Sequence, residues 1–169
     1  MIDEVDAPPE EAPQGSGDPW MVRIVVVLAV VGLLVVLTNI FSSLEARATA
    51  SGGGVEATVT YAVVARRGEV VPLKIDLRGV PGTDEPVTVW IRDSYLDELE
   101  QFGWSPAPTE TVNGSGNVGV FFPNESGALV IELDARLLPT TTLGNHELTL
   151  MVETEVGELD FLLTTLVFP

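Results

Sequence analysis

An uninterrupted apolar stretch near the amino terminus limits what this chain can be. From Ile24 to Leu37 every residue is apolar except Gly32, and no charged residue interrupts the run. A helix of about 20 residues is long enough to cross the roughly 30 Å hydrocarbon core of a bilayer. The many β-branched residues do not oppose a helix there, because lipid offers the backbone groups no partner outside the helix. The sequence therefore predicts a transmembrane α-helix over residues 20–41.

The residues in and around this stretch suit the two interfaces of a membrane. A tryptophan fits the interfacial aromatic belt, an arginine can extend to the headgroups, and small or polar residues can pack against other helices. The residues predicted to serve the anchor are Trp20, Arg23, Gly32, Thr38, Asn39 and Phe41. Arg23 lies closer to its membrane edge than Arg47 does on the other side. The two arginines nearly tie under the positive-inside rule. The Ala-x-Ala triplets after the helix and the β-rich domain that follows favour a plasma-membrane protein with a cytoplasmic amino terminus and an extracytoplasmic carboxy-terminal domain.

Two segments of unusual composition flank the predicted helix. Residues 1–19 contain six acidic residues, four prolines and no lysine or arginine, so we expect a disordered acidic tail. Residues 42–54 end in Ser-Gly-Gly-Gly, which is typical of a flexible linker. The same segment contains Ala-x-Ala triplets like those of signal-peptidase sites. Cleavage near Ala50, which would release a secreted domain, is therefore an alternative to a retained signal-anchor.

Residues 55–169 have the pattern of β structure throughout. Apolar and polar residues alternate with a period of two, and glycine- or proline-rich turns separate the runs. The runs lie at 55–63, 71–77, 87–91, 118–122, 128–134, 146–154 and 158–168. About seven short antiparallel strands in a domain of this length predict a sandwich of two sheets.

Two motifs in this region carry a resemblance to a known class of domain. A Gly-Glu turn opens a strand in residues 67–74, and a Pro/Gly turn precedes the final hairpin in residues 138–150. These motifs resemble those of immunoglobulin-like modules in bacterial envelope proteins, some of which are single-pass proteins with no assigned activity. The resemblance implies an all-β immunoglobulin-like sandwich. The Cys…Trp…Cys core of antibody domains is excluded, because the chain has no cysteine.

One segment departs from the alternating pattern. Residues 93–103 place Tyr95, Leu99 and Phe102 at helical spacing, which predicts a short helix followed by a proline-spaced arm. Aromatic residues dominate binding hot spots, so this segment supplies the predicted partner contacts. These contacts are Tyr95, Phe102, Trp104, Pro106 and Pro108. The alternative is that the segment folds back as a lid over one end of the core.

Composition excludes several classes of function. The net charge is −17, with 25 acidic residues against 8 basic ones, so nucleic acid is not expected as a partner. Without cysteine and with a single histidine, His146, the chain lacks the ligands for thiolate or paired-histidine metal sites. We predict no metal, no cofactor and no small-molecule substrate.

The inventory of catalytic side chains is equally sparse. His146 is the only imidazole, and no Gly-x-Ser-x-Gly motif accompanies it. Lys74, the only lysine, lies inside a predicted strand. The sequence therefore predicts a protein that is not an enzyme and that acts in interaction or assembly. Its partners would be the lipid bilayer and a membrane protein to which it serves as an accessory subunit. An autonomous binding module, tethered to the membrane and directed at an extracellular or envelope ligand, is the alternative.

Overall fold

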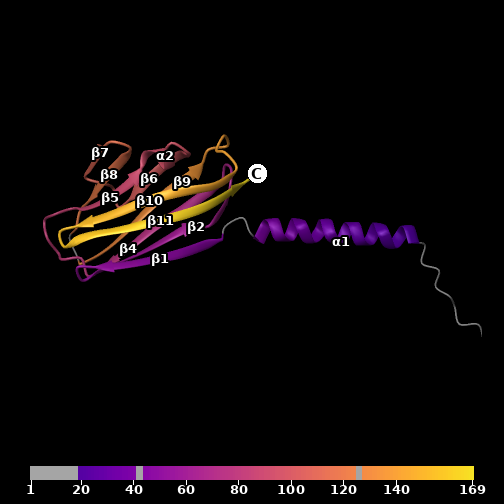
Figure 1. Cartoon of the computed structure of the whole chain (residues 1–169), viewed down its shortest axis with the longest axis horizontal. Coiled ribbons are helices and arrows are strands. Elements are labelled where there is room, and N and C mark those ends of the chain that lie inside the picture. Colours follow the sequence, from indigo (N-terminus) through magenta and orange to yellow (C-terminus); the bar gives the residue numbers. More distant parts are fainter. Residues whose placement is uncertain (1–18, 41–43, 125–126) are drawn as a thin grey trace, which may run out of the picture. The chain divides into compact units, whose positions relative to one another are not determined.

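In its computed structural model the chain divides into an amino-terminal helical unit and a carboxy-terminal β unit (Figure 1). The structure describes residues 19–40, 44–124 and 127–169, without the side chains of 19, 21, 22, 35–40, 101 and 102. Residues 1–18 of the predicted disordered tail and Phe41 therefore lie outside the described residues, as do the side chains of Thr38, Asn39 and Phe102. Pro19, the last residue of the predicted tail, begins a helix.

Among its described residues, the amino-terminal unit contains one helix, α1 (Pro19–Ile40). Its described side chains are those of residue 20 and residues 23–34, and most of its large apolar side chains there are exposed; Trp20, for example, is 66% exposed. Among the residues that the structure describes, no helix meets both the length and the apolar character needed to cross a bilayer. The transmembrane span thus stays a prediction.

The β unit is an all-β sandwich of two mostly antiparallel sheets, and its described residues form eleven strands and one short helix. The first sheet has the order β1-β2-β4-β9-β6, and the second has the order β3-β11-β10-β5-β8-β7. The strands of the first sheet are β1 (Glu45–Gly52), β2 (Val55–Ala62), β4 (Val70–Arg78), β9 (Ala128–Leu137) and β6 (Leu99–Ser105). Those of the second are β3 (Val64–Arg66), β11 (Gly157–Phe168), β10 (Gly144–Thr154), β5 (Val87–Arg92), β8 (Asn117–Phe122) and β7 (Glu110–Asn113). The helix α2 (Asp93–Leu96) follows β5.

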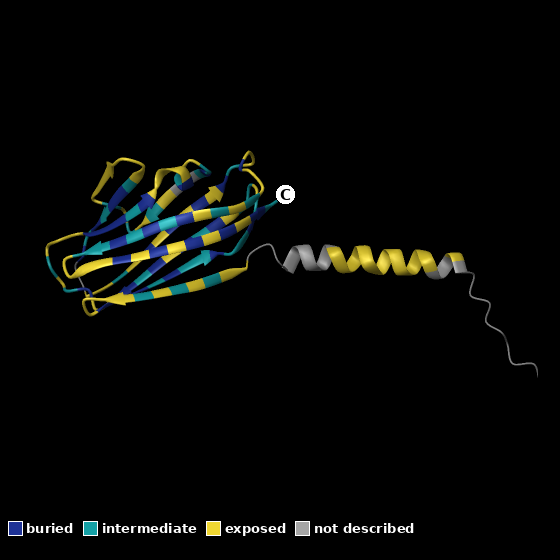
Figure 2. Ribbon diagram, viewed as in Figure 1, coloured by how far each residue is buried: buried dark blue, intermediate teal, exposed yellow. Residues whose placement is uncertain are grey.

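The core lies between the two sheets and follows from the alternating pattern. Along β4 and β11, buried and exposed residues alternate almost without interruption, as the bands in Figure 2 show. Ile75, Leu150 and Phe122 are among the fully buried side chains that fill the interior. Because successive side chains of a strand point to opposite faces, one face of each sheet is apolar and the pairing of the sheets buries it.

The predicted linker is wrong for most of its length. Glu45–Gly52 pairs with Val55–Ala62 as the first strand of a hairpin, and Ala48 and Ala50 pack against the core. Gly53 and Gly54 form the two-residue turn, with φ angles of 61° and 86°. Positive φ at both positions is the geometry of a type I′ hairpin turn, which strongly favours glycine. The glycines therefore form a turn within the sandwich, and only residues 41–44 connect α1 to β1.

The predicted helix over 93–103 is also wrong beyond its first turn. The helix α2 ends at Leu96, and Leu99–Ser105 forms β6, the edge strand that pairs with β9. A register shift between Glu100 and Gly103 interrupts this pairing. That irregularity breaks the period of two in the sequence, which explains why the residues there show helical spacing instead.

Candidate functional site

A groove opens along one side of the sandwich, between the edge strands of the two sheets. We name it the β6–β7 groove, because β6 ends the first sheet and β7 ends the second. It has a volume of about 440 Å³ and includes α2 in its wall. Its lining residues are Asp93, Leu96, Asp97, Trp104, Thr111, Asn113, Gly114, Asn117, Val118 and Val120.

Trp104 forms the aromatic part of the groove. Its ring meets Phe122 of β8 edge-on, with 5.4 Å between the ring centroids and 67° between the ring planes. Phe122 is fully buried, whereas Trp104 is only partly buried. One part of Trp104 therefore seals the core between the sheets, and another lines the groove.

The rim of the groove is polar and its charged members are acidic. Asp93, Asp97, Thr111 and Asn113 are all exposed. Asp93 accepts a hydrogen bond from the backbone N–H of Ser94 at 2.7 Å. Among the described residues, the Asp97 carboxylate has no hydrogen-bond or ion-pair partner. An apolar floor with a few fixed polar groups around it is the usual make-up of a binding site.

The structure separates the residues that the sequence predicts as partner contacts. Trp104 lines the groove, and Pro106 and Pro108 are half-buried beyond the end of β6, outside the groove lining. Tyr95 belongs to the core, with only 8% of its surface exposed. The groove residues Thr111, Asn113 and Asp97 are not predicted from the sequence, because nothing in a single strand or turn indicates that two sheet edges meet.

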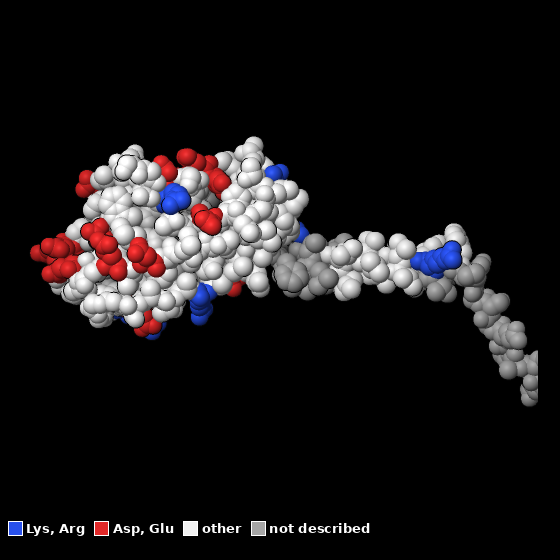
Figure 3. All heavy atoms as spheres, viewed as in Figure 1, with Lys and Arg blue, Asp and Glu red and all other residues white. Residues whose placement is uncertain are grey.

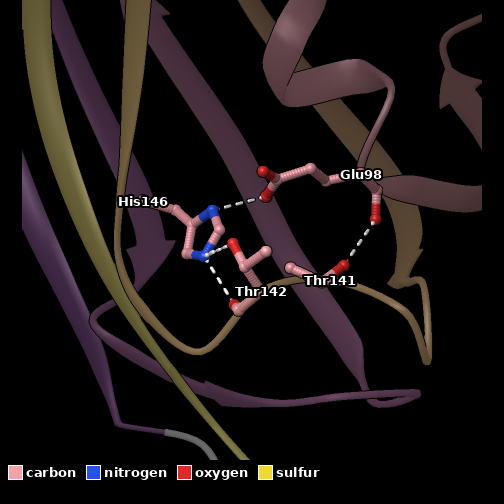
Figure 4. Close-up of polar contacts among 4 residues, drawn as sticks. All are labelled: Glu98, Thr141, Thr142 and His146. Carbon is pink, nitrogen blue, oxygen red and sulfur yellow. Dashed lines mark hydrogen bonds and ion pairs between the residues drawn. The ribbon is translucent and has the colours of Figure 1, made fainter.

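On the other side of α2 lies a pair of ionisable side chains. The Nδ1 atom of His146 is 2.6 Å from Oε2 of Glu98, and the two side chains are 11% and 29% exposed. The Nε2 atom of His146 is 2.8 Å from the carbonyl oxygen of Thr142 and 3.5 Å from its hydroxyl (Figure 4). Apart from His146, the buried Oε2 of Glu98 has no hydrogen-bond partner.

The histidine ring lies between two groups of oxygen atoms. Its Nδ1 atom faces the Glu98 carboxylate, and its Nε2 atom faces the carbonyl and hydroxyl oxygens of Thr142. The short contact between His146 and Glu98 links the start of β10 to the end of α2.

The backbone around Glu98 ties three segments together. The carbonyl oxygen of Glu98 accepts a hydrogen bond from the Leu138 N–H at 2.8 Å. It accepts another from the Thr141 hydroxyl at 3.4 Å (Figure 4). The Glu98 N–H donates to the Tyr95 carbonyl. The end of α2 is therefore bound both to the β9–β10 connection and to the start of β10. His146 is not the ordinary surface residue that its isolation in the sequence suggests.

Tyr95 lies beside this pair, and the pKa of its phenol is raised. Burial, together with the negative charge of Glu98, raises the pKa of Tyr95 to about 12. The phenol of an unfolded chain titrates near pH 10. The folded state thus keeps its proton over a pH range in which the unfolded state has lost it.

We expect this difference to make the fold sensitive to alkali. The contribution of the Tyr95 proton to the free energy of unfolding is complete below about pH 10. It is lost as the pH rises through about 12, because the unfolded state releases its proton first. Urea unfolding at several pH values between 9 and 12 measures the effect. In the Tyr95→Phe variant, the free energy of unfolding should decline less over that pH range. If it declined equally in both proteins, the alkali sensitivity would not come from Tyr95.

No site for a metal ion is evident in the described part of the chain, where no three histidine, aspartate or glutamate side chains gather as ligands. Lys74 lies on the outer face of the first sheet and contacts Glu132 of β9 at 2.7 Å. The hydrogen bond to Glu132 and its charge raise the pKa of Lys74. Lys74 is therefore held in its charged form, in a cross-strand ion pair.

Comparisons with known proteins give one structural match to report. No family model matches the chain, and no curated protein matches it. Among solved structures, the chain is similar to a family 123 glycoside hydrolase from Clostridium perfringens, whose published description concerns glycolipid glycan hydrolysis. The TM-score is 0.36 and the identity is 13%, and the match covers 62% of this chain. The chain spans only 22% of that protein.

This match corrects the prediction that the chain is not an enzyme, because the matched protein is a glycoside hydrolase. At this TM-score and coverage, no catalytic residue, substrate or activity passes from that protein to this chain.

Proposed function

We propose that this chain is a membrane-anchored protein whose β-sandwich binds a protein partner through the β6–β7 groove. The observation that carries the proposal is the groove itself, with Trp104 in its floor and exposed polar side chains around its rim. Partly buried aromatic side chains surrounded by a polar rim are the usual centre of a protein interface. In this proposal the chain serves as an accessory subunit of a membrane complex.

The anchor is residues 20–41, with the amino terminus in the cytoplasm and the sandwich outside. Support comes from α1, which covers almost the same residues, and from the apolar residues 24–37, which occupy every face of that helix. A helix that is apolar all round needs an apolar environment on all sides, and a bilayer provides one. Trp20 and Arg23 would lie at one interface, and Gly32 would allow another helix to approach.

The sandwich is immunoglobulin-like in this proposal. The central order of the first sheet, β2-β4-β9-β6, corresponds to A-B-E-D of such domains, and β11-β10-β5-β8-β7 corresponds to G-F-C-C′-C″. The chain departs from that pattern in its edge strands and in its strand order. The strand β1 is added at the edge of the first sheet, and β3 is added beside β11 in the second. In the sequence, β6 precedes β7 and β8 instead of following them, and β7 at the C″ position precedes β8 at the C′ position.

The hairpin of β1 and β2 bears on the two alternatives. A module that acts at a distance needs a long tether, and residues 51–54 belong to the hairpin instead of a tether. Cleavage near Ala50 would remove most of β1, including Ala48, from the first sheet. Both observations favour a retained anchor with the sandwich attached through few residues.

Two aspartates within α1 should abolish membrane retention. Val27→Asp together with Val31→Asp places two charges near the middle of the predicted span, where each aspartate costs about 2.5–3.5 kcal/mol of insertion free energy. We expect the wild-type protein to stay in membranes washed with alkaline carbonate and the variant to be released. Val27→Leu with Val31→Leu is the matched control. A variant that stays in the washed membranes would contradict the anchor.

Reversal of one charge on the groove rim tests the binding site. We expect Asp97→Lys to reduce recovery of the partner at least about tenfold when the full-length protein is purified from its native membrane in mild detergent. Glu158→Lys, at an exposed position at the start of β11, makes the same charge change away from the groove. If both variants lost the partner equally, the cause would be a general effect of charge. If both retained the partner equally, the interface would lie outside the groove.

A further inference from the structure

The strand β7 presents main-chain groups that have no strand partner. It is the last strand of its sheet and pairs with β8 on one side only, among the described residues. The Gly114 N–H donates to the Asn117 carbonyl at 2.8 Å, which makes residues 114 and 117 a hydrogen-bonded pair. Hydrogen-bonded and non-hydrogen-bonded pairs alternate along an antiparallel ladder. The N–H and C=O groups of Thr111 and Asn113 therefore point away from β8, toward the open edge.

The same two residues belong to the groove. Thr111 and Asn113 line it with their side chains, and all four residues of β7 are exposed. An extended segment that paired with β7 would therefore lie along one lip of the groove. Alternate side chains of that segment would enter the groove, because side chains of a strand alternate between its two faces.

The chemistry of the groove selects the side chain that enters. Its two charged lining residues are Asp93 and Asp97, and its one aromatic residue is Trp104. Carboxylates and an indole ring are the groups that attract an arginine or lysine, through charge-assisted hydrogen bonds and cation–π contact. The whole chain has a net charge of −17, and acidic side chains predominate on the face of the sandwich drawn in Figure 3. A basic partner would therefore also be attracted over a longer range.

We propose that the partner contributes an extended segment that pairs with β7 and places an arginine or lysine between Asp97 and Trp104. This inference rests on the proposed function and adds the chemical class of what the groove binds. The strand addition gives affinity through the main chain of residues 111 and 113, and the basic side chain gives specificity.

Photo-crosslinking from the groove, with paired variants of β7, tests this inference in the full-length protein. A benzophenone amino acid replaces Asn113, the protein is irradiated in its native membrane, and the crosslinked peptide is identified by mass spectrometry. The crosslink is then repeated with Thr111→Pro and with Thr111→Ala. Proline removes only an N–H that β8 does not use, so it is tolerated at this edge, whereas alanine keeps that N–H.

The expected result is a crosslink to a segment that contains an arginine or lysine. Thr111→Pro should reduce it at least about tenfold while Thr111→Ala retains it, at similar thermal midpoints. Replacing the partner's basic residue by glutamine should reduce it likewise. A crosslinked segment without a basic residue, a glycan in place of a peptide, or equal crosslinking by both Thr111 variants would overturn the inference. A partner that co-purifies but never crosslinks from residue 113 would overturn it while leaving the proposed function intact.

Discussion

Replacement of Tyr95 by alanine is expected to lower the free energy of unfolding by about 3–5 kcal/mol, as for other large aromatic residues in a core. Tyr95 is 8% exposed and projects from α2 into the sandwich, so the alanine variant leaves a cavity that the surrounding strands cannot fill. The thermal midpoint of the full-length protein should fall by about 10 °C or more. Thermal unfolding followed by circular dichroism in detergent measures this change.

Two variants on the same segment serve as controls for Tyr95→Ala. Tyr95→Phe keeps the ring and should retain most of the stability at neutral pH. Ser94→Ala changes an exposed neighbour and should leave the midpoint nearly unchanged. If Tyr95→Ala kept the wild-type midpoint and lost only the partner, Tyr95 would be a contact residue. In that case the assignment of this side chain to the core would be incorrect.

The strands that the sequence predicts correctly are those with an unbroken period of two. The run at 71–77 became β4 and the run at 158–168 became β11, in which nearly every second residue is buried. Such strands carry their own signal, because the same residues that define the period also form the core. The four strands that were not predicted, β1, β3, β6 and β7, lack that signal for different reasons.

In β1, alanines occupy the inward positions, and the turn glycines that follow resemble a linker. The strand β3 is three residues long and is separated from β2 by a single residue. The register shift in β6 disturbs the alternation, and β7 has no buried residue at all. The last two of these strands are the two sheet edges at the groove, so the sequence predicts Trp104 in its floor and none of its rim. The pairing of Glu98 with His146 is likewise absent from any local pattern, since 47 residues lie between them in the chain.

The Glu98–His146 pair is expected to contribute more to stability than an ordinary surface ion pair. His146→Ala leaves the buried Oε2 of Glu98 without a partner, and we expect a loss of about 2–4 kcal/mol. This loss of unfolding free energy should exceed the net strength of the contact. Most of it comes from the Glu98 carboxylate, which stays buried without a partner. Urea unfolding of the full-length protein measures it.

A double-mutant cycle separates the contact from that penalty. Glu98→Ala, His146→Ala and the double variant should give a coupling energy of about 1–3 kcal/mol. The matched control is the Lys74–Glu132 pair, whose side chains are 46% and 48% exposed and whose atoms lie 2.7 Å apart. An exposed pair of that kind should give a coupling energy of about 0–1 kcal/mol despite its short distance.

The comparison of the two cycles decides what positions α2 beside the groove. A larger coupling energy for Glu98–His146 would mean that the contact between β10 and the end of α2 helps to fix Asp93 and Asp97 on the groove rim. The rim would then depend on a contact outside the groove, and His146→Ala should weaken partner binding. Equal coupling energies in the two cycles would contradict this view, and would leave Tyr95 and the backbone bonds of Glu98 as the contacts that hold α2.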